Sequence, residues 1–139
     1  MNKFNFDTII KKLESKKSSL PKTLANSTKK FFLASWEKQW WDDNGITKWA
    51  PRKKNKKAIG RAVLVKSGAL KIAVNASLKS ATFDSIKFVV DSPYAKVHND
   101  GLPMRNGKRM PQRQSVGDSA SLRKIQIRDI QKEIDKIFK

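Results

Sequence analysis

Large side chains recur every three or four residues between positions 24 and 40, and this pattern constrains the fold more than any other feature. The stripe, which includes one threonine, consists of Leu24, Thr28, Phe31, Phe32, Trp36 and Trp40. Because an α-helix turns once every 3.6 residues, this spacing puts them on one helical face. Proline is tolerated in the first helical turn and Asn-Gly favours a left-handed cap, so Pro21 and "DDNG" predict a helix over residues 22–43. Such an aromatic stripe needs a sheet to cover.

Strands are expected within residues 63–91. Residues 72–80 and 85–91 form two runs rich in apolar side chains, and the second alternates with a period of two. This period is typical of a strand, and the "TFDS" between the runs suits a hairpin turn. We therefore predict a small antiparallel sheet.

Helical signals occupy much of the remaining chain. Residues 7–17 predict a short first helix, and residues 93–99 predict one or two helical turns closed by Asn99 and Gly101. Ser119 is suited to cap a C-terminal helix over residues 119–138. Its apolar face holds Leu122, Ile127, Ile130, Ile134, Ile137 and Phe138. We predict one α+β domain, residues 1–139, in which the long helix and the C-terminal helix cover the sheet.

Positive charge dominates the composition. The chain has 31 Lys and Arg against 12 Asp and Glu, for a formal net charge of +19. Residues 44–62 are predicted to form a basic loop, with five charges in "RKKNKK": Arg52, Lys53, Lys54, Lys56 and Lys57. This loop is either a solvated surface segment or a site that attracts a polyanion, chiefly the phosphates of DNA.

Residue types needed by several functions are missing from the sequence. With no cysteine, the chain has no disulfide, thiol nucleophile or thiolate metal site, and we expect no cofactor. No apolar run approaches the roughly 18 residues of a membrane span, and the N-terminus lacks the pattern of a secretory signal. We therefore expect a protein made in the cytoplasm, without membrane contact. No nucleophile, acid–base pair or metal constellation is evident, so we expect no enzymatic activity.

The only tyrosine and the only histidine lie together in "SPYAKVHNDG", residues 92–101. A single histidine without cysteine or clustered carboxylates is a poor candidate for a metal ligand or general base. We interpret His98 as a turn residue that hydrogen-bonds the start of the segment after it. Tyr94 is predicted to be a buried anchor with a hydrogen-bonded hydroxyl.

The tryptophans near the basic loop allow two interpretations. Trp40, Trp41 and Trp49 could stack on nucleic-acid bases, as aromatic side chains among basic residues do, or they could pack in the core. The helical stripe favours core packing for Trp40, and the sequence leaves Trp41 and Trp49 open.

Residues 102–117 have few side chains to bury. Between Asp100 and Asp118 the clear aliphatic residues are Leu102, Met104, Met110 and Val116. A long segment without secondary structure is typically functional or mobile. It is either a surface loop or an extended arm that orders only against a neighbouring subunit.

Four short motifs follow one another in a fixed order. They comprise Gly45 to Trp49 in "DNGITKWAPRKK", Leu64 to Leu70 in "AVLVKSGALKIAV", Tyr94, Ala95, His98 and Gly101 in "SPYAKVHNDG", and Met110, Pro111 and Arg113 in "RMPQRQSVGDSASL". With the amphipathic C-terminal helix, this order resembles the phage virion morphogenesis family, the tail-completion proteins typified by that of phage Mu. The resemblance covers about residues 30–138. One departure is "SVG", where the family pattern continues with an aromatic and a further aliphatic residue.

The resemblance implies a structural assembly protein for tail completion or head-to-tail joining. Such proteins form rings at the head-proximal end of the tail or in the neck, and their fold is similar to that of small α+β tail-terminator and neck proteins. It implies self-association, six copies by analogy, contacts with tail-tube, neck or connector proteins, and a place in the virion after synthesis in the host cytoplasm. The implied subunit-interface residues are Tyr94, His98, Gly101, Met110, Pro111 and Arg113. A basic loop facing the lumen would contact phosphates of the packaged duplex.

A second class of function remains open. A nucleic-acid-binding protein without enzymatic activity would also suit the net charge of +19. The chain has no helix-turn-helix, zinc-finger or aromatic-sheet signature of such proteins. The tyrosine turn and the Pro-x-Arg segment favour the structural role, because a general DNA binder does not need them.

Overall fold

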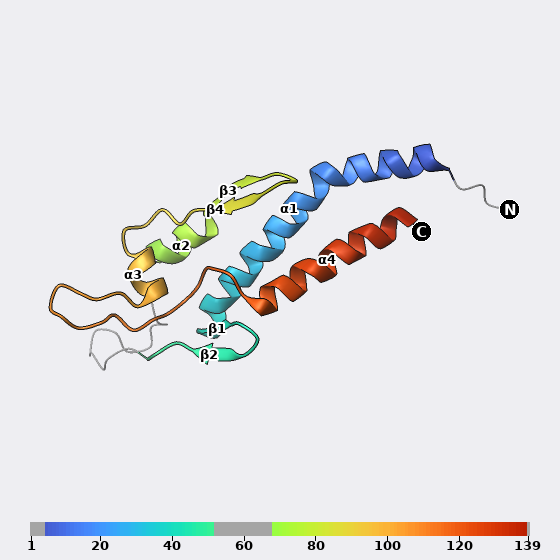
Figure 1. Cartoon of the computed structure of the whole chain (residues 1–139). Coiled ribbons are helices and arrows are strands. Elements are labelled where there is room, and N and C mark those ends of the chain that lie inside the picture. The colour runs from blue at the N-terminus through green and yellow to red at the C-terminus, as the bar shows by residue number, and fades with distance from the viewer. Residues whose placement is uncertain (1–4, 52–67, 139) are drawn as a thin grey trace.

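The structure is a computed structural model that describes residues 5–51 and 68–138. Over these residues the chain is α+β, as predicted, with four helices and two antiparallel two-stranded sheets in place of the one sheet expected. The elements are α1 Phe6–Lys38, β1 Trp40–Asp42, β2 Ile46–Lys48, α2 Ala69–Asn75, β3 Leu78–Ala81, β4 Ile86–Phe88, α3 Ala95–Asp100 and α4 Ala120–Phe138. Figure 1 shows α1 running between the β3–β4 hairpin and α4. The predicted DNA-facing residues of "RKKNKK" lie outside the described residues.

One helix, α1, replaces the two helices predicted over residues 7–17 and 22–43. Asn5 caps it, because its side-chain oxygen accepts a 3.3 Å hydrogen bond from the N–H of Thr8. Pro21 lies inside the helix, where it removes one backbone donor, and its ring is buried. Figure 1 shows α1 bending in its first half. Packing along α1 therefore outweighs the local signal for a helix start at Pro21.

The end of α1 also differs from the prediction. Gln39 adopts a left-handed backbone with φ 58°, and its N–H bonds to the carbonyl of Ser35. The chain then forms β1, which pairs with β2 across a turn at Asn44 and Gly45. The Asn-Gly signal thus marks a hairpin turn rather than the end of a helix.

The β3–β4 hairpin confirms the turn predicted in "TFDS". The N–H of Thr82 donates to the carbonyl of Ser85 at 2.9 Å. The strands are shorter than predicted, because residues 69–75 form α2 instead of the start of a strand. This short helix begins after Gly68, which has a left-handed φ of 75°, and it buries Val74.

The aromatic stripe of α1 contributes to the core, as predicted. The buried core consists of Phe32, Trp36, Trp41, Trp49, Val74 and Leu122. Trp36 meets Trp49 edge-on, with ring centroids 5.3 Å apart. Trp40 is half-buried and lies 5.7 Å from the Lys38 ammonium, so its predicted place in the core is wrong. Because α1 ends before it, Trp40 alternates with Trp41 along a strand, and Trp41 is the one that is buried.

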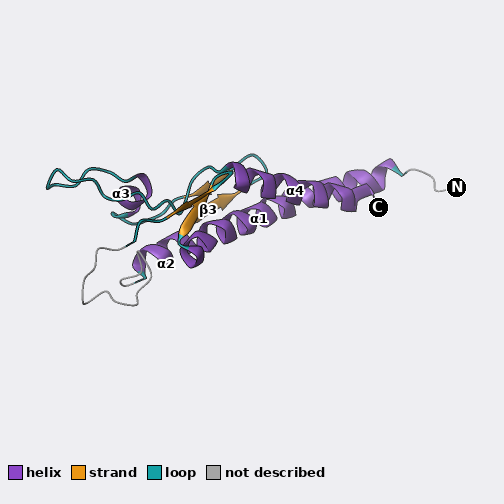
Figure 2. Ribbon diagram, turned by 90° about the horizontal axis from the view of Figure 1, so that it is seen from below, coloured by secondary structure: helices purple, strands orange, loops and turns teal. Residues whose placement is uncertain are grey.

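Helix α4 confirms the predicted C-terminal helix, and its first turn is tied to β1. The hydroxyl of Ser119 accepts a 3.2 Å hydrogen bond from the N–H of Leu122, as an N-cap does. The same hydroxyl donates to the carbonyl of Asp42, and the carboxylate of Asp43 accepts from the N–H of Ala120 at 2.8 Å. An acidic side chain is favourable at this end of a helix. Figures 1 and 2 show α4 antiparallel to α1, with the start of α1 and the end of α4 at the same end of the molecule.

Candidate functional site

Segments that carry three of the sequence motifs meet at one place in the structure, which we call the junction. It comprises α3 with Gly101, residues 110–117 and residues 49–51. Helix α3 ends at Gly101, which has a left-handed φ of 65° and donates its N–H to the carbonyl of Val97 at 3.1 Å. The predicted helical turn closed by Gly101 is therefore confirmed.

A side chain at position 101 would be crowded by the returning chain. A Cβ atom there would lie 3.0 Å from the Cβ of Gln112 and 3.1 Å from the carbonyl oxygen of Met110. Glycine also adopts the left-handed backbone without strain. Gly101 therefore allows α3 to end in a left-handed residue and allows the returning chain to approach closely.

Arg113 fixes the returning chain to two other segments. Its side chain is buried, and Nε donates to the carbonyl of Ala50 at 2.9 Å while a terminal nitrogen donates to that of Pro51 at 3.3 Å. Its backbone N–H donates to the carbonyl of His98 at 2.8 Å. A buried guanidinium is costly unless it is hydrogen-bonded, and these carbonyls supply the acceptors. Arg113 therefore has a structural role within one chain.

Asn99 and Trp49 complete the junction, and the predicted site included neither. The Oδ1 atom of Asn99 accepts from the N–H groups of Ser115 at 3.0 Å and Val116 at 3.1 Å, and Nδ2 donates to the carbonyl of Val116. The indole N–H of Trp49 donates to the carbonyl of Gln114 at 2.9 Å. These partners are far away in the sequence, so no local pattern identifies them.

His98 lies half-buried at the centre of the junction. Its carbonyl bonds to Arg113, late in the segment that follows, rather than to the start of that segment as predicted. The ring atom Nδ1 is buried and has no hydrogen-bond partner among the residues that the structure describes. Burial lowers the pKa of the imidazole, and the charge of Arg113 lowers it further. The ring is therefore neutral near pH 7.

Tyr94 is exposed, so its predicted role as a buried anchor is wrong. Its exposed fraction is 67%, and it stands at the N-cap of the short helix α3. Pro111 is also exposed, and Met110 is half-buried. Of the six predicted interface residues, Gly101, Arg113 and His98 hold the junction together.

Residues 102–117 form hydrogen bonds within their own chain, and they are not one extended arm. Residues 102–110 form a hairpin with a bridge between Pro103 and Arg109 and a 3.0 Å bond from the N–H of Met110 to the carbonyl of Leu102. Residues 111–117 then cross the junction. The expectation that this segment orders only against a neighbouring subunit is wrong for its second half, because α3, Asn99 and Trp49 hydrogen-bond it.

An apolar groove of about 550 Å³ lies nearer the chain termini. It runs between α1, the turn of the β3–β4 hairpin and the C-terminal half of α4. Its apolar lining comprises Leu13, Leu20, Pro21, Leu24, Phe83, Ile86, Ile130, Ile134 and Ile137. Two helices and a hairpin therefore form a concave apolar surface.

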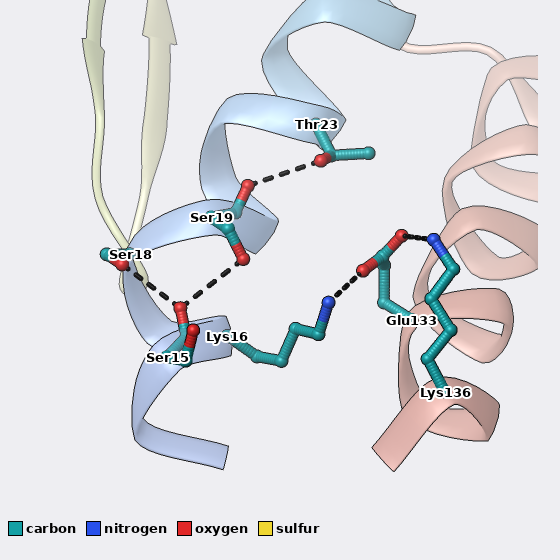
Figure 3. Close-up of polar contacts among 7 residues, drawn as sticks. All are labelled: Ser15, Lys16, Ser18, Ser19, Thr23, Glu133 and Lys136. Carbon is teal, nitrogen blue, oxygen red and sulfur yellow. Dashed lines mark hydrogen bonds and ion pairs between the residues drawn. The ribbon is translucent and has the colours of Figure 1, made fainter. Parts of the chain in front are cut away.

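An ion pair joins the two helices beside the groove. Lys16 of α1 lies 2.5 Å from the carboxylate of Glu133 on α4, which also binds Lys136 at 2.8 Å (Figure 3). Hydrogen bonds from Lys136 and Lys16 lower the pKa of Glu133 to about 2. The carboxylate of Glu133 in the wall of the groove is therefore ionised, and the two lysines balance its charge.

Most of the helical lining of the groove belongs to a larger apolar surface that we call the helical projection: residues 6–20 of α1 and 127–138 of α4. Figure 1 shows these parts extending away from the other elements. Its exposed large apolar residues are Phe6, Ile10, Leu13, Ile127, Ile134 and Phe138, each between 44% and 69% exposed. The helical projection holds seven basic and five acidic residues, so it is nearly neutral within a chain of net charge +19.

Within the described residues, neither surface carries a cluster of side chains that could hold a metal ion. In residues 5–51 and 68–138, no three His, Cys, Asp or Glu side chains group as they would around a metal ion. No helix within these ranges is long and apolar enough to span a membrane. In comparisons with known proteins, no family model, curated protein or solved structure matches the chain.

Proposed function

We propose that this chain is a structural protein of tailed phages that assembles into a ring and acts in tail completion or head-to-tail joining. The ring would lie in the virion, at the head-proximal end of the tail or in the neck, against tail-tube, neck or connector proteins. The resemblance of its four motifs to the phage virion morphogenesis family supports this role. The observation that supports the proposal most is the exposed apolar surface of the helical projection and its groove.

The helical projection has the character of an uncovered interface. Contiguous apolar patches are uncommon on soluble monomers and mark interaction sites. Leu13 and Ile134 line the groove and remain 45% and 44% exposed, and Phe83 at its rim is 62% exposed. Covering such side chains contributes about 25 cal/mol per Å² of apolar surface. We infer that another protein surface covers the groove.

The distribution of charge favours a second copy of this chain as that partner. Two chains of net charge +19 repel each other, so copies associate best where the charge is balanced. The helical projection has seven basic and five acidic residues, whereas the rest of the chain has 24 and seven. Self-association is therefore least opposed at the helical projection.

Head-to-tail contacts between copies at this surface would generate a ring. The helical projection lies at one end of an elongated molecule, and the 102–110 hairpin lies at the other (Figures 1 and 2). A groove that receives a different surface of the next copy makes a heterologous contact, which generates a ring when the rotation closes. In this account Gly101, Asn99 and Arg113 hold the shape of each copy. The family resemblance suggests six copies.

The mass of the purified full chain tests this proposal. The double variant Leu13→Glu with Ile134→Glu places two charges in the groove, and we expect light scattering to show monomers where the wild-type chain forms a defined oligomer. Both positions are exposed enough that the fold should survive, which circular dichroism checks. The control Asn26→Glu with Thr47→Glu adds the same charge at exposed positions outside both the groove and the helical projection, and should keep the wild-type mass. A monomeric wild-type chain, or a groove variant with the wild-type mass, would contradict the proposal.

A second candidate is a basic nucleic-acid-binding protein without enzymatic activity. The 24 basic and seven acidic residues outside the helical projection favour it. A monomer that binds duplex DNA with a steep salt dependence would support this function over ring assembly. Removing the five charges of residues 52–57 should weaken DNA binding in either case and leave the oligomeric mass unchanged.

A further inference from the structure

The 102–110 hairpin is an ordered, narrow protrusion. The N–H of Met104 donates to the carbonyl of Lys108 at 2.7 Å, and the N–H of Gly107 donates to the carbonyl of Met104 at 3.0 Å. The side-chain oxygen of Asn106 accepts from the N–H of Lys108 at 3.1 Å, and Gly107 supplies the left-handed φ of 78° that the turn requires. Figures 1 and 2 show this loop extending from the end of the molecule opposite the termini.

Positive charge at the tip of the hairpin is not neutralised. Arg105, Lys108 and Arg109 are all exposed, and no acidic residue occurs between Asp100 and Asp118. None of the three forms an ion pair within the part of the chain that the structure describes. Three cations that have no ion-pair partner among the described residues therefore lie close together in residues 105–109 of the hairpin.

The base of the hairpin is fixed to the junction. The N–H of Met110 bonds to the carbonyl of Leu102, and the chain beside it packs within 3.2 Å of where a Cβ of Gly101 would lie. Three residues further on, Arg113 is anchored by its bonds to residues 50 and 51. The cations are therefore presented on a preformed support, which reduces the entropy lost on binding.

We propose that the 102–110 hairpin binds the phosphate backbone of duplex DNA, without reading its sequence. Interfaces with proteins are usually centred on aromatic or other apolar anchors, and no residue of the hairpin is among the exposed large apolar side chains. Phosphate contacts need only cations and N–H donors. This inference does not depend on ring assembly, because a single chain carries the complete hairpin.

Binding to a mixed-sequence duplex, measured over a range of salt concentrations, tests the inference. For three phosphate contacts, the slope of log K against log salt should be smaller by about 2.7 in the variant Arg105→Ala, Lys108→Ala, Arg109→Ala. The control Lys22→Ala, Lys79→Ala, Lys87→Ala removes the same charge from exposed positions elsewhere and should change the slope by less than about 1. Arg105→Lys with Arg109→Lys keeps the charge and should keep the wild-type slope.

Two results would overturn the inference. Equal losses of slope in the hairpin variant and the control would mean that net charge alone, and no particular site, attracts DNA. An unchanged slope with an altered oligomeric mass would mean that the hairpin contacts a protein surface instead. Light scattering of each variant shows whether it forms rings or monomers. Because the salt slope can be measured on either species, a failure of ring assembly is distinguished from a failure of DNA binding.

Discussion

The junction is held together by contacts within the chain, whereas the helical projection leaves apolar side chains exposed. At the junction, single polar residues hold irregular backbone: Asn99 makes three hydrogen bonds to residues 115 and 116, and Arg113 binds two carbonyls through its side chain. At the helical projection, regular helices satisfy their own backbone and leave apolar side chains such as Phe6 and Phe138 exposed. One region is complete within the monomer, and the other has apolar surface still to cover.

This difference indicates where stability and assembly reside. A polar network of backbone contacts is sensitive to small changes, because a buried group that loses its partner keeps its desolvation cost. An exposed apolar surface contributes little to the stability of the monomer and becomes favourable only when a partner covers it. Substitutions at the junction should therefore affect folding, and substitutions in the groove should affect association.

The largest effect on folding is expected for Gly101→Ala. The new Cβ would lie 3.0 Å from Gln112 on a left-handed backbone, so the free energy of unfolding should fall by about 2–4 kcal/mol in urea titrations. Gly107→Ala is the matched control, because φ is also positive there and no atom lies within 4 Å of the new Cβ. That variant should lose only about 1 kcal/mol. Equal losses would show that backbone torsion, rather than close packing at the junction, explains Gly101.

A smaller effect should come from the ion pair beside the groove. The pKa of Glu133 lies near 2 in the folded chain, against an ordinary value of 4.5. Its contribution to stability is therefore complete above pH 4.5 and is lost as the pH falls toward 2. The wild-type chain should lose up to about 1 kcal/mol more than Glu133→Gln between pH 5 and pH 2. Glu14→Gln, at an exposed position of α1, is the control and should follow the wild-type chain. If the urea midpoints of the wild-type chain and of Glu133→Gln fell equally, the ion pair would contribute nothing to stability.

Local signals predicted part of this structure. The N-cap at Ser119, the turn in "TFDS" and the left-handed Gly101 each depend on neighbouring residues, and each was found in the expected place. The helical projection had such a signal too, since Phe6, Ile10 and Leu13 follow helical spacing. The helix predicted over residues 7–17 leaves out Phe6 and ends before the middle of α1, and no exposed apolar surface was predicted there.

Other features depend on contacts between distant segments. Pro21 sits inside α1 because packing there outweighs one lost backbone bond, and Trp41 replaces Trp40 in the core because β1 pairs with β2. Residues 111–117 are ordered by Asn99 and by Trp49, which lies about 65 residues away. Composition alone describes this segment as having little to bury, because its order comes from hydrogen bonds rather than from apolar side chains.

Electron microscopy of single particles of the purified full chain tests the central claim most directly. We expect closed rings in which the helical projection of each copy is covered by the next copy. Isolated monomers, or rings in which the helical projections remain exposed to solvent, would contradict the assignment of this surface to self-assembly.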